Sequence, residues 1–187
     1  MTTYNELAGY RVNYLSTDPT LNSGNEGQVW YNSTSGQLKS LVQIKSWAAG
    51  GNMSTARGES GGAGTQTLGL VFGGNGPSNA TEEYNGSTWT TGGNLNTGRQ
   101  YPAGAGTQTE GLAFGGETTV NTGATEEYNG TSWTTSTSMT TARRVLGGAG
   151  TLQAGLAFGG FITANTAATE EYTGAFQLPA ASILTTS

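Results

Sequence analysis

Residues 71–91 read VFGGNGPSNATEEYNGSTWTT, and most of this stretch occurs three times in the 187-residue chain. The second copy, residues 113–135, reads AFGGETTVNTGATEEYNGTSWTT, and the third, residues 157–176, reads AFGGFITANTAATEEYTGAF. The FGG triplets are separated by 42 and then 44 residues, whereas the TEEY tyrosines are separated by 44 residues each time. The difference of two residues falls in the loop after FGG. The chain therefore contains a structural repeat with one loop of variable length.

Turn residues divide each repeat into short strands. Asn85-Gly86 separates ATEEY from STWTT, and Asn-Gly between β-forming residues predicts a hairpin with a type I′ turn. GGAGT and LGLVFGG predict a second hairpin that turns at Gln66-Thr67. No repeat has a sustained helical period. We therefore predict an all-β chain with about four short strands per repeat, which is the content of one propeller blade.

The composition excludes several classes of function. Only 10% of the residues are charged, the net charge is −5, and no cluster of Lys and Arg marks a nucleic-acid surface. We therefore expect no nucleic-acid binding. No apolar run is long enough to span a bilayer, so we also expect no membrane insertion. The chain has no Cys and no His, which removes disulfides and the commonest ligands of transition metals. We expect no enzymatic activity, no cofactor and no transition metal.

The combination of residues in each repeat resembles the Kelch repeat, in which a double glycine is followed by a Tyr and, about six residues later, a Trp. The first match is Gly73-Gly74, Tyr84 and Trp89, with an upstream Arg that is also typical of the family. The second repeat has the same set, and the third has no Trp. Glu stands before each Tyr, where Kelch repeats usually have an apolar residue. The resemblance covers residues 46–175 and implies three Kelch-like four-stranded repeats.

Three repeats are fewer than the 4–8 blades with which propellers close, so we predict an incomplete propeller or an open β array. The Gly/Thr/Asn-rich texture is similar to Kelch-like arrays in structural proteins of tailed bacteriophages, notably marine ones. Residues 15–41 contain a Gly-x-φ-Trp-Tyr-Asn hairpin that resembles the start of phage tail-fibre proteins. Residues 1–45 are accordingly predicted to be a short β-hairpin segment for attachment or assembly, and residues 176–187 an apolar tail.

The paired glutamates of TEEY are the most conspicuous candidates for chemistry. Neighbouring residues of a strand point to opposite faces, so one pair cannot act as acid and base on one substrate. A ladder of carboxylates across the repeats could bind Ca²⁺. The interpretation that we favour is that one Glu of each pair meets solvent and the other forms a salt bridge with the repeat Arg, which occurs in the same phase. The residues concerned are Arg57, Arg99, Arg143, Glu82, Glu83, Glu126, Glu127, Glu170 and Glu171.

The loops after FGG differ between the copies and read NGPSNA, ETTVNTGA and FITANTAA. A constant scaffold with variable loops is the arrangement of a recognition surface, although the loops could equally be neutral spacers. The candidate recognition residues are Asn75, Pro77, Asn79, Glu117, Val120, Asn121, Phe161, Ile162 and Asn165. Rows of Trp and Tyr could stack on sugars, but such periodic aromatics more often form the packing between neighbouring β units.

The resemblance implies a virion structural protein, associated with the phage tail or fibre, that makes assembly contacts and can recognise the host surface. The expected partners are other copies of the chain, other virion proteins and a host-surface glycan. An alternative is a cellular carbohydrate-binding or scaffold module with Kelch-like repeats. We expect the tail to be buried in a homo-oligomer, for which the fibre resemblance suggests a trimer. The apolar tail residues concerned are Phe176, Leu178, Ile183 and Leu184.

Overall fold

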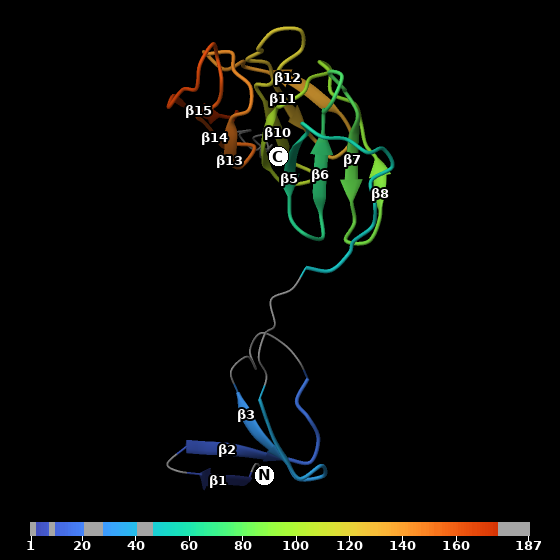
Figure 1. Cartoon of the computed structure of the whole chain (residues 1–187), viewed down its shortest axis with the longest axis vertical. Helices are drawn as coiled ribbons and strands as arrows, with labels where there is room; N and C mark the ends of the chain where they lie inside the picture. The colour runs from blue at the N-terminus through green and yellow to red at the C-terminus, as the bar shows by residue number, and fades with distance from the viewer. Residues whose placement is uncertain (1–2, 8–9, 21–27, 41–46, 176–187) are drawn as a thin grey trace, which may run out of the picture. The chain divides into compact units, whose positions relative to one another are not determined.

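The computed structural model describes residues 3–7, 10–20, 28–40 and 47–175 (Figure 1). These residues form fifteen strands in four sheets, and no helix occurs among them. The prediction of an all-β chain is therefore confirmed. In the part of the chain that the structure describes, there is consequently no helix that could cross a bilayer. The chain divides into two compact units, Met1–Ala49 and Gly50–Ser187, each of which is described by itself.

The first unit contains a four-stranded sheet in the order β1-β2-β3-β4. Its strands are β1 (Thr3–Leu7), β2 (Tyr10–Leu15), β3 (Val29–Asn32) and β4 (Gln37–Ser40). The hairpin predicted from the sequence is β3–β4, but it forms only half of the sheet because β2 pairs with β3 in parallel. The N-terminal segment is thus a four-stranded sheet, which is larger than the short hairpin that we predicted. Alternation of apolar and polar residues in YRVNY is a signal that indicates β2.

Asp18 holds this sheet to the segment that follows β2. One of its carboxylate oxygens accepts hydrogen bonds from Trp30 Nε1 at 3.0 Å and Asn32 Nδ2 at 2.7 Å. The other oxygen lies 2.7 Å from Lys39 Nζ. Hydrogen bonds from Lys39, Asn32 and Trp30 stabilise the ionised carboxylate and lower the pKa of Asp18 to about 2.

Acidification is expected to weaken the first unit in a defined pH window. Because the pKa of Asp18 is about 2 in the folded chain and 3.8 ordinarily, its stabilisation is complete above pH ~4 and is lost as the pH falls to about 2. The Trp30 indole N–H resonance should shift through this window. In the Asp18→Asn variant the shift should be absent. A wild-type resonance that does not move between pH 4 and 2 would contradict the assignment.

The second unit contains three antiparallel meanders, one for each repeat. The first sheet is β5 (Gly61–Gly64), β6 (Gly69–Phe72), β7 (Thr81–Tyr84) and β8 (Trp89–Thr91). The second sheet is β9 (Ala103–Gly106), β10 (Gly111–Phe114), β11 (Thr125–Tyr128) and β12 (Trp133–Ser136). The third sheet is β13 (Gly147–Gly150), β14 (Ala154–Phe158) and β15 (Thr169–Thr173). Four strands per repeat, as predicted, are present in the first two repeats, and three are present in the described part of the third.

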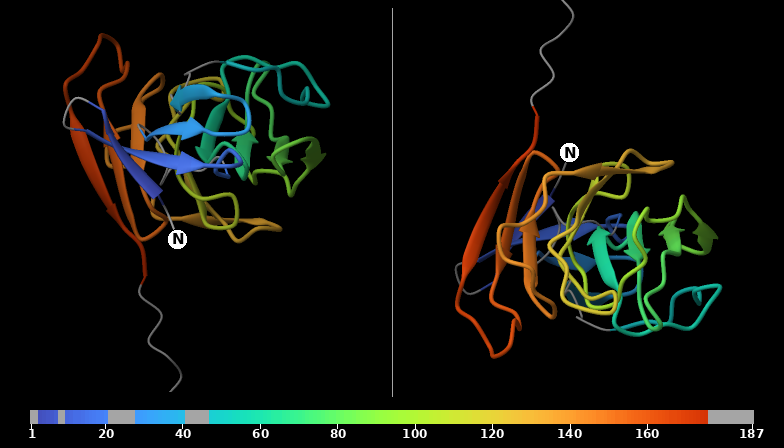
Figure 2. Two further views of the ribbon diagram at one scale, coloured as in Figure 1. Left: turned by 90° about the horizontal axis from the view of Figure 1, so that it is seen from below. Right: turned by 90° about the horizontal axis from the view of Figure 1, so that it is seen from above.

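The glycine-rich first strands of the three sheets lie side by side, with β9 between β5 and β13 (Figures 1 and 2). Glycine is required here because the backbones approach closely. A Cβ on Gly104 would overlap the carbonyl oxygen of Gly62, and one on Gly148 would lie 2.6 Å from the carbonyl oxygen of Gly104. The sheets therefore form an open β array, and within the described residues β5 and β13 do not meet to close it.

The hairpin between β7 and β8 differs from the predicted type I′ turn. Tyr84 pairs with Trp89, so the loop has four residues, and only Gly86 among them has a positive φ. The side chain of Asn85 accepts the backbone N–H of Ser87 at 3.0 Å and of Thr88 at 2.9 Å. Asn85 therefore stabilises the loop through its side chain rather than through a left-handed backbone. The second repeat repeats this geometry at Asn129.

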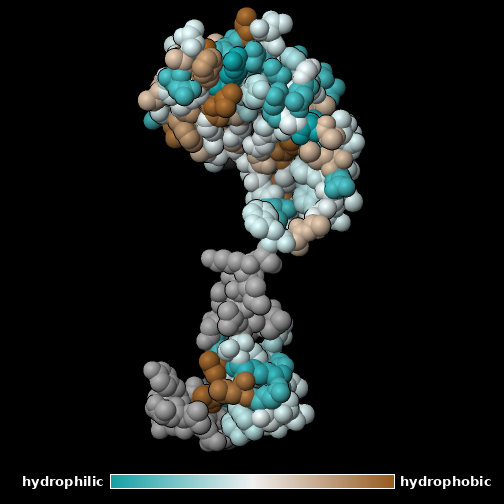
Figure 3. All heavy atoms as spheres, in the orientation of Figure 1, coloured by the Kyte–Doolittle hydropathy of each residue, from teal (hydrophilic) through white to brown (hydrophobic). Residues whose placement is uncertain are grey.

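Apolar side chains fill the spaces between successive sheets. Leu70 and Phe72 of the first sheet form a cluster with Tyr128 and Trp133 of the second. Leu112 and Phe114 of the second sheet form the corresponding cluster with residues of the third. On the face drawn in Figure 3, exposed apolar side chains occur in small separate groups. Most of the hydrophobic stabilisation of the array thus lies between its sheets.

Candidate functional site

Each repeat Arg forms an ion pair with the first Glu of the TEEY strand in its own repeat. Arg57 Nη2 contacts Glu82 Oε1, and Arg99 Nη2 lies 2.9 Å from Glu126 Oε1. Arg143 Nη1 lies 2.6 Å from Glu170 Oε1. The salt bridges predicted from the shared phase of these residues are therefore confirmed. In the second repeat both side chains are almost completely buried, with 0% and 1% exposed.

The same carboxylates also accept hydrogen bonds from backbone N–H groups in the segment before the first strand of each sheet. Ser54 donates to Glu82 at 2.7 Å, and Thr140 donates to Glu170 at 2.6 Å. Burial raises the pKa of both carboxyl groups, but these backbone hydrogen bonds and the nearby guanidinium groups outweigh burial, so the pKa of each lies below its ordinary value. Glu82 and Glu170 are therefore ionised, and each holds a guanidinium group and a backbone segment together.

The second Glu of the first two pairs does not meet solvent as we expected. Glu83 of the first sheet accepts a hydrogen bond from the hydroxyl of Tyr128 in the second sheet. Glu127 in turn accepts one from Tyr172 in the third sheet. Burial and the hydrogen bond to Glu83 raise the pKa of Tyr128 to about 12. These glutamates therefore connect neighbouring sheets, whereas Glu171 is exposed.

The carboxylates do not assemble into a metal site in the described part of the chain. No group of three or more His, Cys, Asp or Glu side chains there is close enough to hold an ion. The first Glu of each pair has an Arg partner, and Glu83 and Glu127 have Tyr partners, so these carboxylates stabilise the array.

The variable loops of the second and third repeats lie side by side. Asn121 Nδ2 donates to the backbone carbonyl of Phe161 at 3.1 Å and to that of Ile162 at 2.9 Å. Each loop also forms single β-bridges, Gln100 with Glu117 and Arg144 with Phe161. These contacts fix the two loops as one surface.

An open groove of about 550 Å³ runs along this surface, with Arg144 as its main charged group. The guanidinium of Arg144 lies 3.0 Å from Glu117 Oε1 and 4.9 Å from the centroid of the Phe161 ring. Its Nη1 lies 3.4 Å from Asn121 Oδ1. Three partners thus orient a cation that remains partly exposed, and Tyr101 and Asn165 are among the other residues that line the groove.

The groove contains some of the predicted recognition residues and not others. Glu117, Phe161 and Asn165 line it. Asn121 joins the two loops, and Val120 and Ile162 are exposed. The first loop does not line the groove: Asn75 accepts the backbone N–H of Gly58 with its side chain, and Pro77 and Asn79 are exposed.

Arg144, Gln100, Tyr101 and Val145 are lining residues that the sequence interpretation missed. They follow directly after the repeat Arg, where the three copies read RGES, RQYP and RRVL. The variation of these residues between the three copies is the signal that could have indicated a second variable segment in each repeat. The groove is therefore made from two variable segments of each repeat rather than from one.

The two residues after each repeat Arg include one with an unusual backbone. Glu59, Tyr101 and Val145 have φ angles of 59°, 55° and 54°, although none is glycine. The Tyr101 N–H donates to the Glu59 carbonyl at 2.6 Å, and the Val145 N–H donates to the Tyr101 carbonyl at 3.4 Å. The left-handed conformation is thus repeated along a hydrogen-bonded ladder, and Tyr101 and Val145 of this ladder line the groove.

The apolar tail predicted to mediate assembly, with Phe176, Leu178, Ile183 and Leu184, lies outside the described residues. Comparison with protein families gave no matching family model. Comparison with curated proteins gave no match either.

Proposed function

We propose that the chain is a non-enzymatic structural protein of a tailed-phage virion, associated with the tail or fibre, that contacts a glycan of the host surface. The observation that carries the recognition role is the groove. The second and third repeats share the segments GAGT, GLAFGG and ATEEY, whereas the corresponding lining residues Gln100 and Arg144, Tyr101 and Val145, and Glu117 and Phe161 differ. Such a division between constant frame and variable lining is typical of a binding surface.

The chemistry of the groove suits a carbohydrate. It presents a carboxylate, a guanidinium, amides and the Tyr101 hydroxyl beside an aromatic ring. Sugars offer many hydroxyl groups together with apolar ring faces, so they need this mixture of directed hydrogen bonds and apolar contact. Arg144 is held in place by Glu117 before any ligand arrives, which reduces the entropy lost on binding.

The virion assignment rests on the resemblance to Kelch-like arrays and tail-fibre segments of phages. A cellular carbohydrate-binding or scaffold module with the same repeats would use the same groove. Antibody labelling of phage particles, with the chain identified by mass spectrometry of purified virions, distinguishes the two. Absence of the chain from purified particles would favour the cellular module.

Glycan binding can be tested with the full chain and a panel of purified bacterial O-antigen and capsular polysaccharides, using calorimetry. For any glycan that binds, Arg144→Ala should weaken affinity by about 10-fold or more, since it removes a charged hydrogen-bond donor. Pro77→Ala, in the loop of the first repeat outside the groove, is the matched control and should bind as the wild type. Equal binding by both variants would place the site elsewhere.

A further inference from the structure

The two ends of the repeat array present complementary halves of the interface that joins its sheets. Within the chain, a Cβ on Gly111 would lie 2.8 Å from Leu70 of the preceding sheet, and one on Gly155 would lie 2.6 Å from Leu112. Gly69 is the equivalent glycine of the first sheet, and its nearest atoms all belong to its own repeat. Leu156 of the third sheet is the equivalent leucine and has no following sheet among the described residues.

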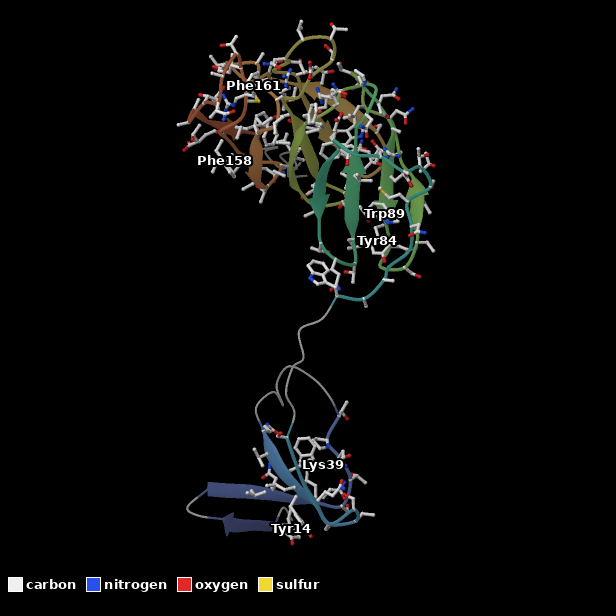
Figure 4. The ribbon with its side chains drawn as sticks, in the orientation of Figure 1. Tyr14, Lys39, Tyr84, Trp89, Phe158 and Phe161 are labelled. Atoms are coloured by element: carbon white, nitrogen blue, oxygen red, sulfur yellow. The ribbon has the colours of Figure 1, made fainter. Side chains whose placement is uncertain are left out.

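Aromatic and acidic residues show the same incomplete pattern. Phe72 and Phe114, each covered by a following sheet, are 0% and 3% exposed, whereas Phe158 is 43% exposed. Glu171, in the position of Glu83 and Glu127, is exposed. At the other end, Tyr84 and Trp89 lie against each other with ring centroids 4.9 Å apart on a sheet that has no preceding neighbour in the array (Figure 4). The third sheet thus exposes the residues that a following sheet would cover, and the first sheet carries the aromatic residues that would cover them.

The third sheet also lacks a fourth strand in the described part of the chain. In the first two sheets this strand begins with Trp89 or Trp133. One further segment that begins with Trp and continues into Gly-Gly-Asn precedes the array. Trp47-Ala-Ala-Gly-Gly-Asn has the same pattern as Trp89-Thr-Thr-Gly-Gly-Asn. Trp47 is fully exposed.

The glycines of this segment are already placed as in the internal repeat. A Cβ on Gly50 would lie 2.9 Å from the Tyr84 hydroxyl, as one on Gly92 would lie 2.8 Å from that of Tyr128. A Cβ on Gly51 would overlap the carbonyl of Ser87, as one on Gly93 would overlap that of Thr131. The first sheet therefore holds residues 50–51 as the second sheet holds residues 92–93. The strand that should precede them, residues 47–49, has no sheet of the array as its partner.

A cavity of about 220 Å³ lies between residues of the second and third sheets, at the position that corresponds to that of Trp133. Between the first and second sheets, Trp133 packs 5.0 Å from the Phe72 ring and donates from Nε1 to Thr81 at 3.0 Å. The equivalent residues between the second and third sheets, Phe114 and Thr125, line the cavity together with Tyr172. Residue 177, the sequence equivalent of Trp133, is Gln and lies outside the described residues.

We propose that a second copy of this chain donates residues 47–49 as the fourth strand of the third sheet. Trp47 then fills the cavity beside Phe114 and Tyr172, as Trp133 fills its counterpart. The donating chain continues into its own first sheet, which brings Tyr84 to Glu171 and Gly69 to Leu156 of the acceptor.

Two reciprocal donations join two chains into one ring. The ring contains six sheets, which is within the 4–8 that propellers close with, whereas three chains would give nine. The inferred partner is therefore one copy, not the two of the trimer suggested by the fibre resemblance.

Cysteine cross-linking tests the register directly, because the chain has no Cys of its own. Glu83 pairs with Thr90 in the first sheet, so Glu171 should pair with Ala48 of the partner. Oxidation of the full chain carrying Ala48→Cys and Glu171→Cys should give a covalent dimer on a non-reducing gel. The matched control, Ala48→Cys with Thr169→Cys, places the second Cys two residues out of register and should not cross-link. A disulfide within one chain, or equal cross-linking of the control, would overturn the proposal.

Native mass and sedimentation measurements test the assembly itself. The full chain should have twice its own mass of 19.1 kDa. Trp47→Ala should raise the dissociation constant of the dimer by about 100-fold, as expected for a buried aromatic anchor. Gly62→Ala should also weaken the dimer. Gly62 is the equivalent of Gly104 and Gly148, whose Cβ atoms would overlap the preceding sheet, whereas a Cβ on Gly62 meets only its own repeat within one chain. In the dimer that Cβ would meet the third sheet of the partner. Val120→Ala, on an exposed loop, should leave the mass unchanged. A monomer at all concentrations, a trimer or an open polymer would contradict the closed pair.

Discussion

Arg99→Met is expected to lower the free energy of unfolding of the repeat array by about 3–5 kcal/mol, the cost of leaving a buried carboxylate without its partner. Glu126 is 1% exposed and depends on the Arg99 guanidinium at 2.9 Å for neutralisation. The substitution also removes a hydrogen bond from Arg99 to the Ala124 carbonyl. Urea denaturation followed by circular dichroism measures the loss.

Two further variants identify the cause of this loss. Adding Glu126→Gln to Arg99→Met removes the uncompensated charge and should recover part of the stability. Arg144→Met breaks an ion pair with Glu117 that is partly exposed, so it should cost only about 1 kcal/mol or less. If Arg99→Met and Arg144→Met destabilise the chain equally, burial does not determine the strength of these pairs.

Trp133→Ala is expected to destabilise the array by about 3–5 kcal/mol, the range found when a buried aromatic side chain is truncated. Trp133 is 5% exposed and packs 4.8 Å from the Tyr128 ring as well as on Phe72 of the preceding sheet. Its removal would leave between the first two sheets a cavity like the one that already exists between the second and third. Thermal unfolding of the variant measures the difference.

Trp133→Phe is the control for this prediction. It keeps an aromatic ring between the sheets and loses mainly the hydrogen bond to Thr81, so it should cost about 1–2 kcal/mol. A loss as large as that of Trp133→Ala would show that the hydrogen bond, rather than ring packing, holds the two sheets together.

The sequence was sufficient to predict the features that repeat with a fixed phase. The strands, the hairpin at Gln66-Thr67 and the pairing of Arg99 with Glu126 all lie within one repeat, so the period alone places them. The partner of Glu83 could not be predicted in this way. It is Tyr128, which belongs to the next sheet, and its position depends on how neighbouring sheets are offset.

Local conformation and non-periodic segments were predicted less well. Asn85-Gly86 has the composition of a type I′ turn, but the chain forms a longer loop because the Asn85 side chain bonds to two backbone N–H groups. The parallel pairing of β2 with β3 has no counterpart in the repeats that could have indicated it. Arg144 could not be found from the loops after FGG, because it lies 17 residues before Phe161 and reaches that loop only through a β-bridge in the folded chain.

Glu59, Tyr101 and Val145 adopt one backbone conformation with three unrelated side chains. A left-handed residue other than glycine costs about 1–3 kcal/mol, and the ladder of backbone hydrogen bonds maintains it in every repeat. The main chain at these positions therefore does not depend on which side chain it carries. Tyr101 and Val145 line the groove, so a substitution at either position would change the lining of the groove on a backbone that the ladder already fixes.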